Sequence, residues 1–328
     1  MRHIRVSAHV TGLIPSRPTA EFPHWSANMI TPLRGWSMPD DDAAARAAAE
    51  EESAFSHPHV APDVTAAYGD HPDQLIDFYA PRTDEPLVPL VVVLHGGAWR
   101  AAYDRGHITP FADCLARRGF AVANVEYRRG AALPAQGGTA PVAGRWPDTF
   151  DDVAAALDAL PALVREAVPR ADPRRTVLTG HSAGGHLALW AAARHVLPAD
   201  SGWRTSGPAL LRGVVALAPI ADFAMAEKLD VCGNAALQLL GGEEKFTDRQ
   251  RYADPALLLP TGIATTLVQG RTDVVVPHAV AESYAEAAAK AGEVVGLTLL
   301  EDVGHFPLID PAADACAVVA EEIAQLAW

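Results

Sequence analysis

The chain has 328 residues, of which 49% are hydrophobic, and a formal net charge of -14 from 40 acidic and 26 basic side chains. This length supports one large domain or two smaller ones. The negative charge argues against nucleic acids and anionic membrane surfaces as partners, because these would repel an acidic protein. No apolar run approaches the ~20 residues that a membrane-spanning helix needs.

The first residues of the chain lack the apolar core of a signal peptide, so we expect a cytoplasmic protein without a membrane partner. Its three cysteines, Cys114, Cys232 and Cys316, are far apart in the sequence. They fit neither a disulfide framework nor the spacing of metal ligands. We therefore predict no metal and no cofactor, and the oligomeric state stays open, with a homo-oligomer as one alternative.

Residues 1–67 differ from the rest of the chain, because they are rich in Pro, His and Trp and show no regular period. One helix is predicted there, over 40–52, with acidic residues at its start, where the positive end of the helix dipole favours them. We treat 1–67 as an N-terminal extension. Its helix is either a cap over an active site or a solvent-exposed Ala/Glu helix.

Residues 68–328 form the predicted catalytic domain, in which strands and helices alternate. The predicted strands are apolar and often β-branched, and they cover 74–79, 89–94, 120–127, 175–179, 212–218, 264–269 and 295–300. The predicted helices cover 109–118, 148–168, 183–195, 278–291 and 311–326, the second being interrupted or ended near Pro161. This alternation predicts an α/β fold with a mainly parallel central sheet and helices on both faces.

Residues 219–262 are irregular apart from a helical stretch near 234–240. This connection is longer than is usual between a strand and a helix, and long connections are often functional. We therefore expect 219–262 to be an insertion that lines the pocket.

The sequence Gly-His-Ser-Ala-Gly at 180–184 follows an apolar strand and precedes an Ala-rich helix. Strand, sharp turn and helix are the context of a nucleophile elbow, in which the serine hydroxyl is exposed on a strained turn. The small glycines let the strand and the helix pass close to the turn. Ser182 is therefore the predicted nucleophile.

A serine hydroxyl needs a base that takes its proton and an acid that orients the base. Asp273 follows the predicted strand 264–269 and His305 follows 295–300, so both lie at the carboxyl ends of strands, where catalytic groups gather. The order Ser182, Asp273, His305 is the order found in α/β-hydrolases. Two other acids are alternatives to Asp273. Asp302 shares a short loop with His305, and Asp222 is better explained as a helix N-cap.

The oxyanion of an acyl-transfer reaction is stabilised by backbone N–H groups in a tight turn. His-Gly-Gly-Ala-Trp at 95–99 follows a predicted strand and fits this need, so Gly97 and Ala98 are predicted donors, together with Ala183 after the nucleophile. We expect His95 to hold this loop by hydrogen bonding. Trp99 either contacts the substrate or packs in the core.

These stretches together resemble α/β-hydrolase serine esterases. The resemblance covers 68–326 and rests on 95–99, on Gly-His-Ser-Ala-Gly-Gly-His-Leu at 180–187, on the Asp273 loop and on Gly-His-Phe at 304–306. It is closest to the group of kynurenine formamidase, hormone-sensitive-lipase-like esterases and feruloyl or acetyl esterases. The lipase-like esterases carry a third glycine where this chain has Ala98.

The resemblance and the residues together predict a serine hydrolase that cleaves small carboxylic esters through an acyl-enzyme. An arylformamidase, which hydrolyses N-formylkynurenine, is the first alternative. A binding protein that retains the fold without the chemistry is the second, although the complete set of Ser182, Asp273 and His305 argues against it. The expected partner is a small ester or formamide.

Overall fold

The computed structural model describes residues 41–130 and 143–328. Within these residues, eight strands form one sheet in the order β1-β2-β4-β3-β5-β6-β7-β8. Their bounds are Val64–Ala67, Leu75–Tyr79, Val88–Leu94, Ala121–Val125, Ala171–His181, Gly213–Leu217, Thr265–Gly270 and Gly296–Leu300 for β1 to β8. The pairs β1–β2 and β2–β4 are antiparallel and the other pairs are parallel. The predicted mainly parallel sheet is confirmed.

The strand β3 shows how the sheet is covered on both faces. Each of its seven residues is buried. Val91 and Val93 belong to one hydrophobic core, whereas Leu90 and Val92 belong to the core on the opposite face. A continuous apolar run suits such a strand because neither face meets water.

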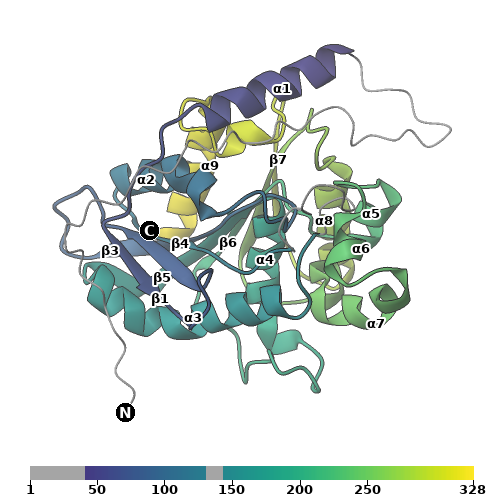
Figure 1. Ribbon diagram of the computed structural model, residues 1–328, viewed down its shortest axis with the longest axis horizontal. Coiled ribbons are helices and arrows are strands. Elements are labelled where there is room, and N and C mark those ends of the chain that lie inside the picture. The colour runs from purple at the N-terminus through teal and green to yellow at the C-terminus, as the bar shows by residue number, and fades with distance from the viewer. Residues whose placement is uncertain (1–40, 131–142) are drawn as a thin grey trace.

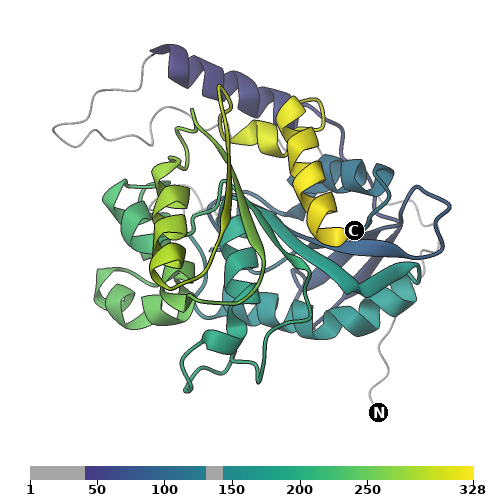
Figure 2. The ribbon, with the colours of Figure 1, turned by 180° about the vertical axis from the view of Figure 1, so that it is seen from behind.

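The helices form a layer on each face (Figures 1 and 2). One core includes side chains of α2 (Thr109–Arg117) and α9 (Asp314–Ala327). The other includes side chains of α3 (Asp148–Ala167), α4 (Ala183–Ala192) and α8 (Ala279–Lys290). The remaining α-helices are α1 (Asp41–Phe55), α5 (Phe223–Lys228), α6 (Ala235–Leu239) and α7 (Glu243–Ala253), and the 3-10 helices are η2 (Arg105–Ile108), η3 (Arg194–Val196), η4 (Pro255–Leu258) and η5 (Phe306–Leu308).

Three local predictions need correction. The helix α3 runs unbroken through Pro161. Pro161 lacks the N–H that the helical hydrogen-bond pattern uses, and its side chain is exposed, away from the core against which α3 packs. The segment 219–262 contains the helices α5, α7 and η4 in addition to the expected helical stretch. The sheet begins at Val64, so β1 lies within residues 1–67.

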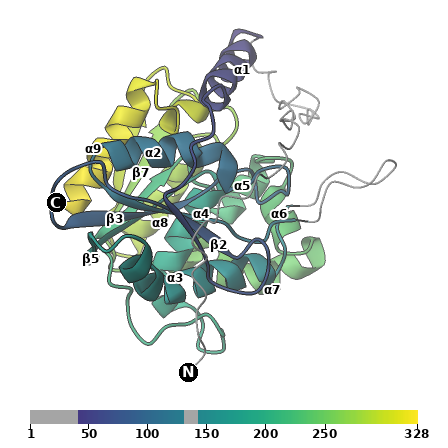
Figure 3. The same ribbon diagram turned by 60° about the vertical axis from the view of Figure 1, so that its left-hand side comes forward.

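The predicted N-terminal helix is confirmed as α1, and the part of the extension before Asp41 lies outside the described residues. Figures 1 and 3 show α1 at the rim of the molecule, close to the C-terminal segment that follows β8. It packs against η5, which begins directly after His305. Among the described helices, none is long and apolar enough to cross a membrane.

Candidate active site

Ser182 occupies a strained turn between β5 and α4. Its backbone has φ 57° and ψ −118°, a left-handed conformation that a non-glycine residue adopts at a cost of about 1–3 kcal/mol. The turn is held by a 2.8 Å hydrogen bond from the Ser182 N–H to the carbonyl of Leu217 on the neighbouring strand. A side chain at Gly184 would place Cβ 2.0 Å from the carbonyl oxygen of Leu94. The close approach of α4 to β3 therefore requires glycine there.

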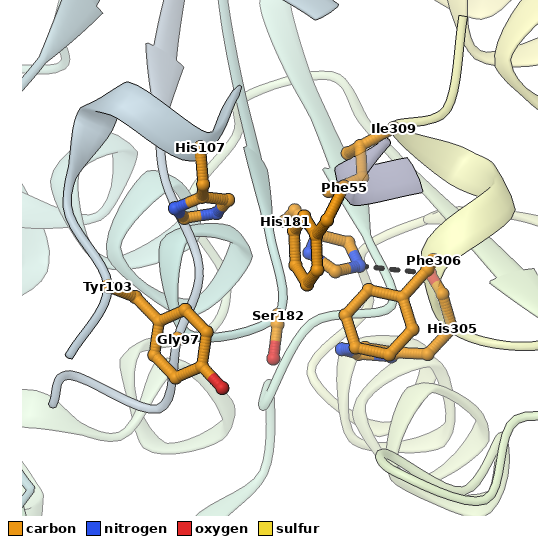
Figure 4. Close-up of a pocket in the computed structure, with 9 residues that line it drawn as sticks. All are labelled: Phe55, Gly97, Tyr103, His107, His181, Ser182, His305, Phe306 and Ile309. Atoms are coloured by element: carbon orange, nitrogen blue, oxygen red, sulfur yellow. Dashed lines mark hydrogen bonds between the residues drawn. The ribbon is translucent and has the colours of Figure 1, made fainter. Parts of the chain in front are cut away.

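His305 and Asp273 are joined side by side after β8 and β7. The distance from His305 Nδ1 to Asp273 Oδ2 is 2.7 Å. A carboxylate only accepts hydrogen bonds, so Nδ1 carries the proton and Nε2 keeps a free lone pair. That is the tautomer that a general base needs. Ser182 and His305 both line one pocket, and Figure 4 shows them facing it together.

The Asp273 carboxylate is fixed by three further donors. Its Oδ1 accepts the N–H groups of Val275 and Val276, each at 2.8 Å, and its Oδ2 accepts Nε2 of Gln269 at 3.1 Å. These donors stabilise the ionised carboxylate and set its orientation. The rival acids lie elsewhere. Asp302 is exposed, and Asp222 caps α5 by accepting the N–H of Met225, as predicted.

The loop after β3 turns sharply beside Ser182. The backbone φ angles of Gly97, Ala98 and Trp99 are 102°, 50° and 55°. A Cβ atom at Gly97 would lie 2.3 Å from Cβ of Tyr103, so this turn has no room for a side chain there. Ala183 is the first residue of α4, where backbone N–H groups lack partners within the helix. The three predicted donors thus belong to the two turns that flank the nucleophile.

The loop after β3 is held by hydrogen bonds of His95, as expected. Nε2 of His95 lies 2.9 Å from Oε1 of Glu126, and the hydroxyl of Tyr127 donates to the carbonyl of His95 at 2.6 Å. The Tyr127 ring stacks on the His95 ring with 4.3 Å between centroids. Burial raises the pKa of Glu126, but His95 and Arg129 outweigh it and lower that pKa to about 2. Glu126 was not singled out in the sequence, since no motif surrounds it.

Two other histidines support the site. His181 donates from Nε2 to the carbonyl of His305 at 3.0 Å, drawn as the dashed line in Figure 4. Burial, with the neighbouring His305, holds the pKa of His181 well below its usual value, so its ring is neutral. His186 bonds the carbonyl of Ala253 through Nε2 at 2.9 Å and lies in the core. Within the described part of the chain, both histidines bond backbone carbonyls, whereas His305 is the histidine bonded to Asp273.

Trp99 packs in the core and does not line the pocket. Its side chain is 0% exposed and its ring contacts the rings of His186 and Phe223 edge to face, at 5.1 and 6.2 Å between centroids. The substrate-contact alternative for Trp99 is therefore not supported by the geometry. This side chain points inward from a turn in which φ is positive at both Ala98 and Trp99.

The pocket beside Ser182 is small, with a cavity volume of about 10 Å³. That is room for about one water molecule. Besides the residues already introduced, its walls include Phe55, Tyr103, His107, Phe306 and Ile309. None of its lining residues comes from 219–262, the segment expected to line it. The sequence carried no signal for Phe55 or His107, because their place depends on contacts between distant segments.

The helix α1 reaches this pocket and is fastened to the loops around His305. Oε1 of Glu50 accepts the N–H of Gly304 at 3.1 Å. Burial raises the pKa of Glu50 above its ordinary value, and the nearby Asp273 acts in the same direction. Ser53 and His57 bond the two carboxylate oxygens of Asp310, each at 2.6 Å.

Comparison with known proteins agrees with this architecture. The BD-FAE family model matches residues 76–287, a range that includes Ser182 and Asp273 and ends before His305. A probable isoprenylcysteine alpha-carbonyl methylesterase of rice (Oryza sativa subsp. japonica) is 26% identical over 276 residues, which are 79% of this chain and 61% of the relative. A kynurenine formamidase of Danio rerio is 24% identical over 254 residues, which are 75% of each chain.

Among solved structures, an inhibited esterase B from Lactobacillus rhamnosis superposes with a TM-score of 0.66 at 21% identity. The match covers 87% of this chain and 93% of the esterase. The α/β-hydrolase fold is thereby confirmed, as is the resemblance to the esterase group. The chain spans about three-fifths of the rice relative, so that relative contains regions with no counterpart here.

Proposed function

Because this chain belongs to the BD-FAE family of α/β-hydrolases, we propose that it is a serine hydrolase that cleaves small carboxylic esters. Ser182 is the proposed nucleophile, His305 the general base and Asp273 the acid that orients it. The observation that carries this proposal is the 2.7 Å bond from His305 Nδ1 to Asp273, beside a serine on a strained turn. Three groups from three loops converge there, as acyl transfer requires.

The reaction follows from the atoms available. Nε2 of His305 takes the Ser182 hydroxyl proton while Oγ bonds to the ester carbonyl carbon. The backbone N–H groups of Gly97, Ala98 and Ala183 are the proposed donors to the oxyanion. Collapse breaks the bond to the alcohol, which receives the proton from His305 and leaves. Water, deprotonated by His305, then attacks the acyl-enzyme and releases the acid.

The substitution Ser182→Ala tests this proposal directly. The variant should lose hydrolysis of p-nitrophenyl acetate by at least about three orders of magnitude in kcat, because no other group can form the acyl-enzyme. Circular dichroism of both proteins controls for folding. Wild-type turnover by the variant would refute the proposal and favour a binding protein.

Arylformamidase activity is the second candidate. It is favoured by the formamidase relative, which aligns over three quarters of both chains, and by the small pocket, since a formyl group is the smallest acyl group. The same catalytic set serves both reactions. Comparing kcat/KM for N-formylkynurenine with that for phenyl acetate separates them, and a preference for the formamide above about tenfold would assign the enzyme to formamide hydrolysis.

We also propose that the N-terminal extension acts as a cap through α1. The support is three hydrogen bonds to the segment that carries His305, two made by Glu50 and Ser53 of α1 and one by His57, which follows the helix. Phe55 at the end of α1 adds a wall to the pocket. The remaining residues, 68–328, then supply the catalytic groups.

A further inference from the structure

His107 is a buried histidine in the pocket that the proposed reaction does not use. It belongs to η2 and is 9% exposed. Its ring is packed edge to face by the rings of Phe55, His95 and Tyr103, at 5.7, 5.6 and 5.9 Å between centroids. In Figure 4, His107 and Tyr103 lie on one side of Ser182 and His305 on the other.

The tautomer of His107 is set by the backbone. Nδ1 lies 2.6 Å from the carbonyl oxygen of Asp104, and a carbonyl only accepts, so Nδ1 carries a proton. Burial, reinforced by the nearby His95, lowers the pKa of His107 to about 4. The ring is therefore neutral at neutral pH, and its other nitrogen, Nε2, is a hydrogen-bond acceptor.

Nε2 of His107 takes part in no hydrogen bond between described residues, and it is not among the fully buried side-chain atoms without a partner, so part of its surface is accessible. An accessible acceptor in a mostly buried ring can bond a water molecule or a ligand group that reaches it. His107 lines the cavity that also holds Ser182. A substrate that fills the cavity would meet it.

We propose that His107 is a specificity-determining residue that accepts a hydrogen bond from a hydroxyl or N–H group on the short part of the substrate that enters the cavity. This inference rests on the proposed function and names the substrate class: small esters that carry a donor one or two carbons from the scissile group. The cavity volume of about 10 Å³ and the aromatic walls exclude a long or branched chain. The substrate donor then supplies a hydrogen bond to Nε2 of His107 that no residue of 41–130 or 143–328 makes.

Two pairs of esters of nearly equal shape test the proposal. Methyl glycolate differs from methyl propionate, and 2-hydroxyethyl acetate from propyl acetate, by a hydroxyl in place of a methyl group. The first pair probes the acyl side and the second the alcohol side. The measured quantity is the ratio of kcat/KM between hydroxyl and methyl members, compared between wild-type and His107→Phe proteins, so that intrinsic reactivity cancels.

We expect the ratio to fall about 5- to 10-fold in His107→Phe for one of the pairs, because the hydroxyl member loses its acceptor while the methyl member keeps its contacts. His107→Gln, which retains an acceptor, should keep most of the ratio and provides a second variant if Phe disturbs folding. The surface substitution His278→Phe is the matched control and should change neither ratio.

If His107 served packing alone, His107→Phe would lower kcat/KM for both esters of each pair by the same factor, and the ratio would stay unchanged. Unchanged ratios in both pairs would therefore overturn the proposal for His107. Failure of the proposed function is distinguishable, since the wild-type protein would then hydrolyse none of the four esters.

Discussion

The loops at the carboxyl ends of the strands and the helix α1 contribute to the same pocket in different ways. Ser182, Asp273 and His305 are each at most 5% exposed and are held by backbone hydrogen bonds or by each other. The helix α1 is exposed along most of its length and touches the body through one side. The strand-end loops thus fix the proposed catalytic groups, whereas α1 and η2 contribute walls to the pocket beside Ser182.

This difference predicts two kinds of defect. Changes in the strand-end loops should remove activity toward every substrate. Changes in α1 or η2 should alter the choice among substrates while the chemistry persists.

The substitution Asp273→Asn should have the largest effect short of removing the nucleophile. Asparagine keeps the shape but donates a hydrogen bond as well as accepting one, so His305 loses its fixed tautomer. We expect kcat/KM to fall by about three to four orders of magnitude for all esters alike. Steady-state kinetics on acetyl and butyryl esters would check this. A loss confined to one acyl length would contradict the assignment of Asp273 to the reaction.

Phe55→Ala should alter selectivity. Removal of the ring enlarges the pocket beside Ser182, so we expect the kcat/KM ratio of p-nitrophenyl butyrate to p-nitrophenyl acetate to rise by about tenfold, with acetate turnover nearly kept. Phe246→Ala, in the core away from the pocket, is the control for general loosening. An unchanged ratio would show that α1 does not limit the substrate.

Glu50 joins the two regions, because a side chain of α1 bonds the backbone of the His305 loop. Glu50→Ala should lower kcat about 3- to 10-fold, which corresponds to the free-energy contribution of about one hydrogen bond. Glu50→Gln retains the acceptor and should recover most of the loss. Equal losses in both variants would assign the effect to charge near His305 instead.

Asp310→Asn should have the smallest effect on catalysis and act on the attachment of α1. Burial raises the pKa of Asp310, but Ser53, the Ala312 N–H and His57 together lower it below its ordinary value. The charged form is thus stabilised in the folded protein, and this stabilisation is present above pH ~4 and lost as the pH falls further. We expect a loss of about 1 kcal/mol in the free energy of unfolding at pH 7.

The same experiment at low pH provides the check. In urea titrations, the difference between Asp310→Asn and wild-type proteins should shrink between pH 7 and pH 3, because protonation then removes the wild-type charge. A difference that grows on acidification would contradict the attachment described for Asp310.

The sequence allowed prediction of the sheet and of the residues that follow its strands. Ser182, Asp273 and His305 each follow an apolar run, and a strand end fixes the position of the next residue within a few ångströms. Glycine at 184 signals the close approach of helix and strand. These signals are local, so one sequence suffices to detect them.

The pocket walls could not be predicted in this way. Phe55 and His107 lie far apart in the sequence, and their meeting depends on how α1 docks beside η5. Trp99 is an opposite example, because the sequence places this aromatic residue beside the predicted site whereas the structure buries it in the core. The direction of its side chain depends on the backbone conformation of the turn at 97–99, which the sequence pattern does not reveal.

Ser182 is proposed to attack the substrate carbonyl. The most direct test of this role is covalent labelling of the wild-type protein with a fluorophosphonate, followed by mass spectrometry of the peptide that contains Ser182. We expect one label per chain, located on Ser182, with esterase activity falling in proportion and no label in Ser182→Ala. An unlabelled Ser182 in a protein that still hydrolyses esters would contradict this role.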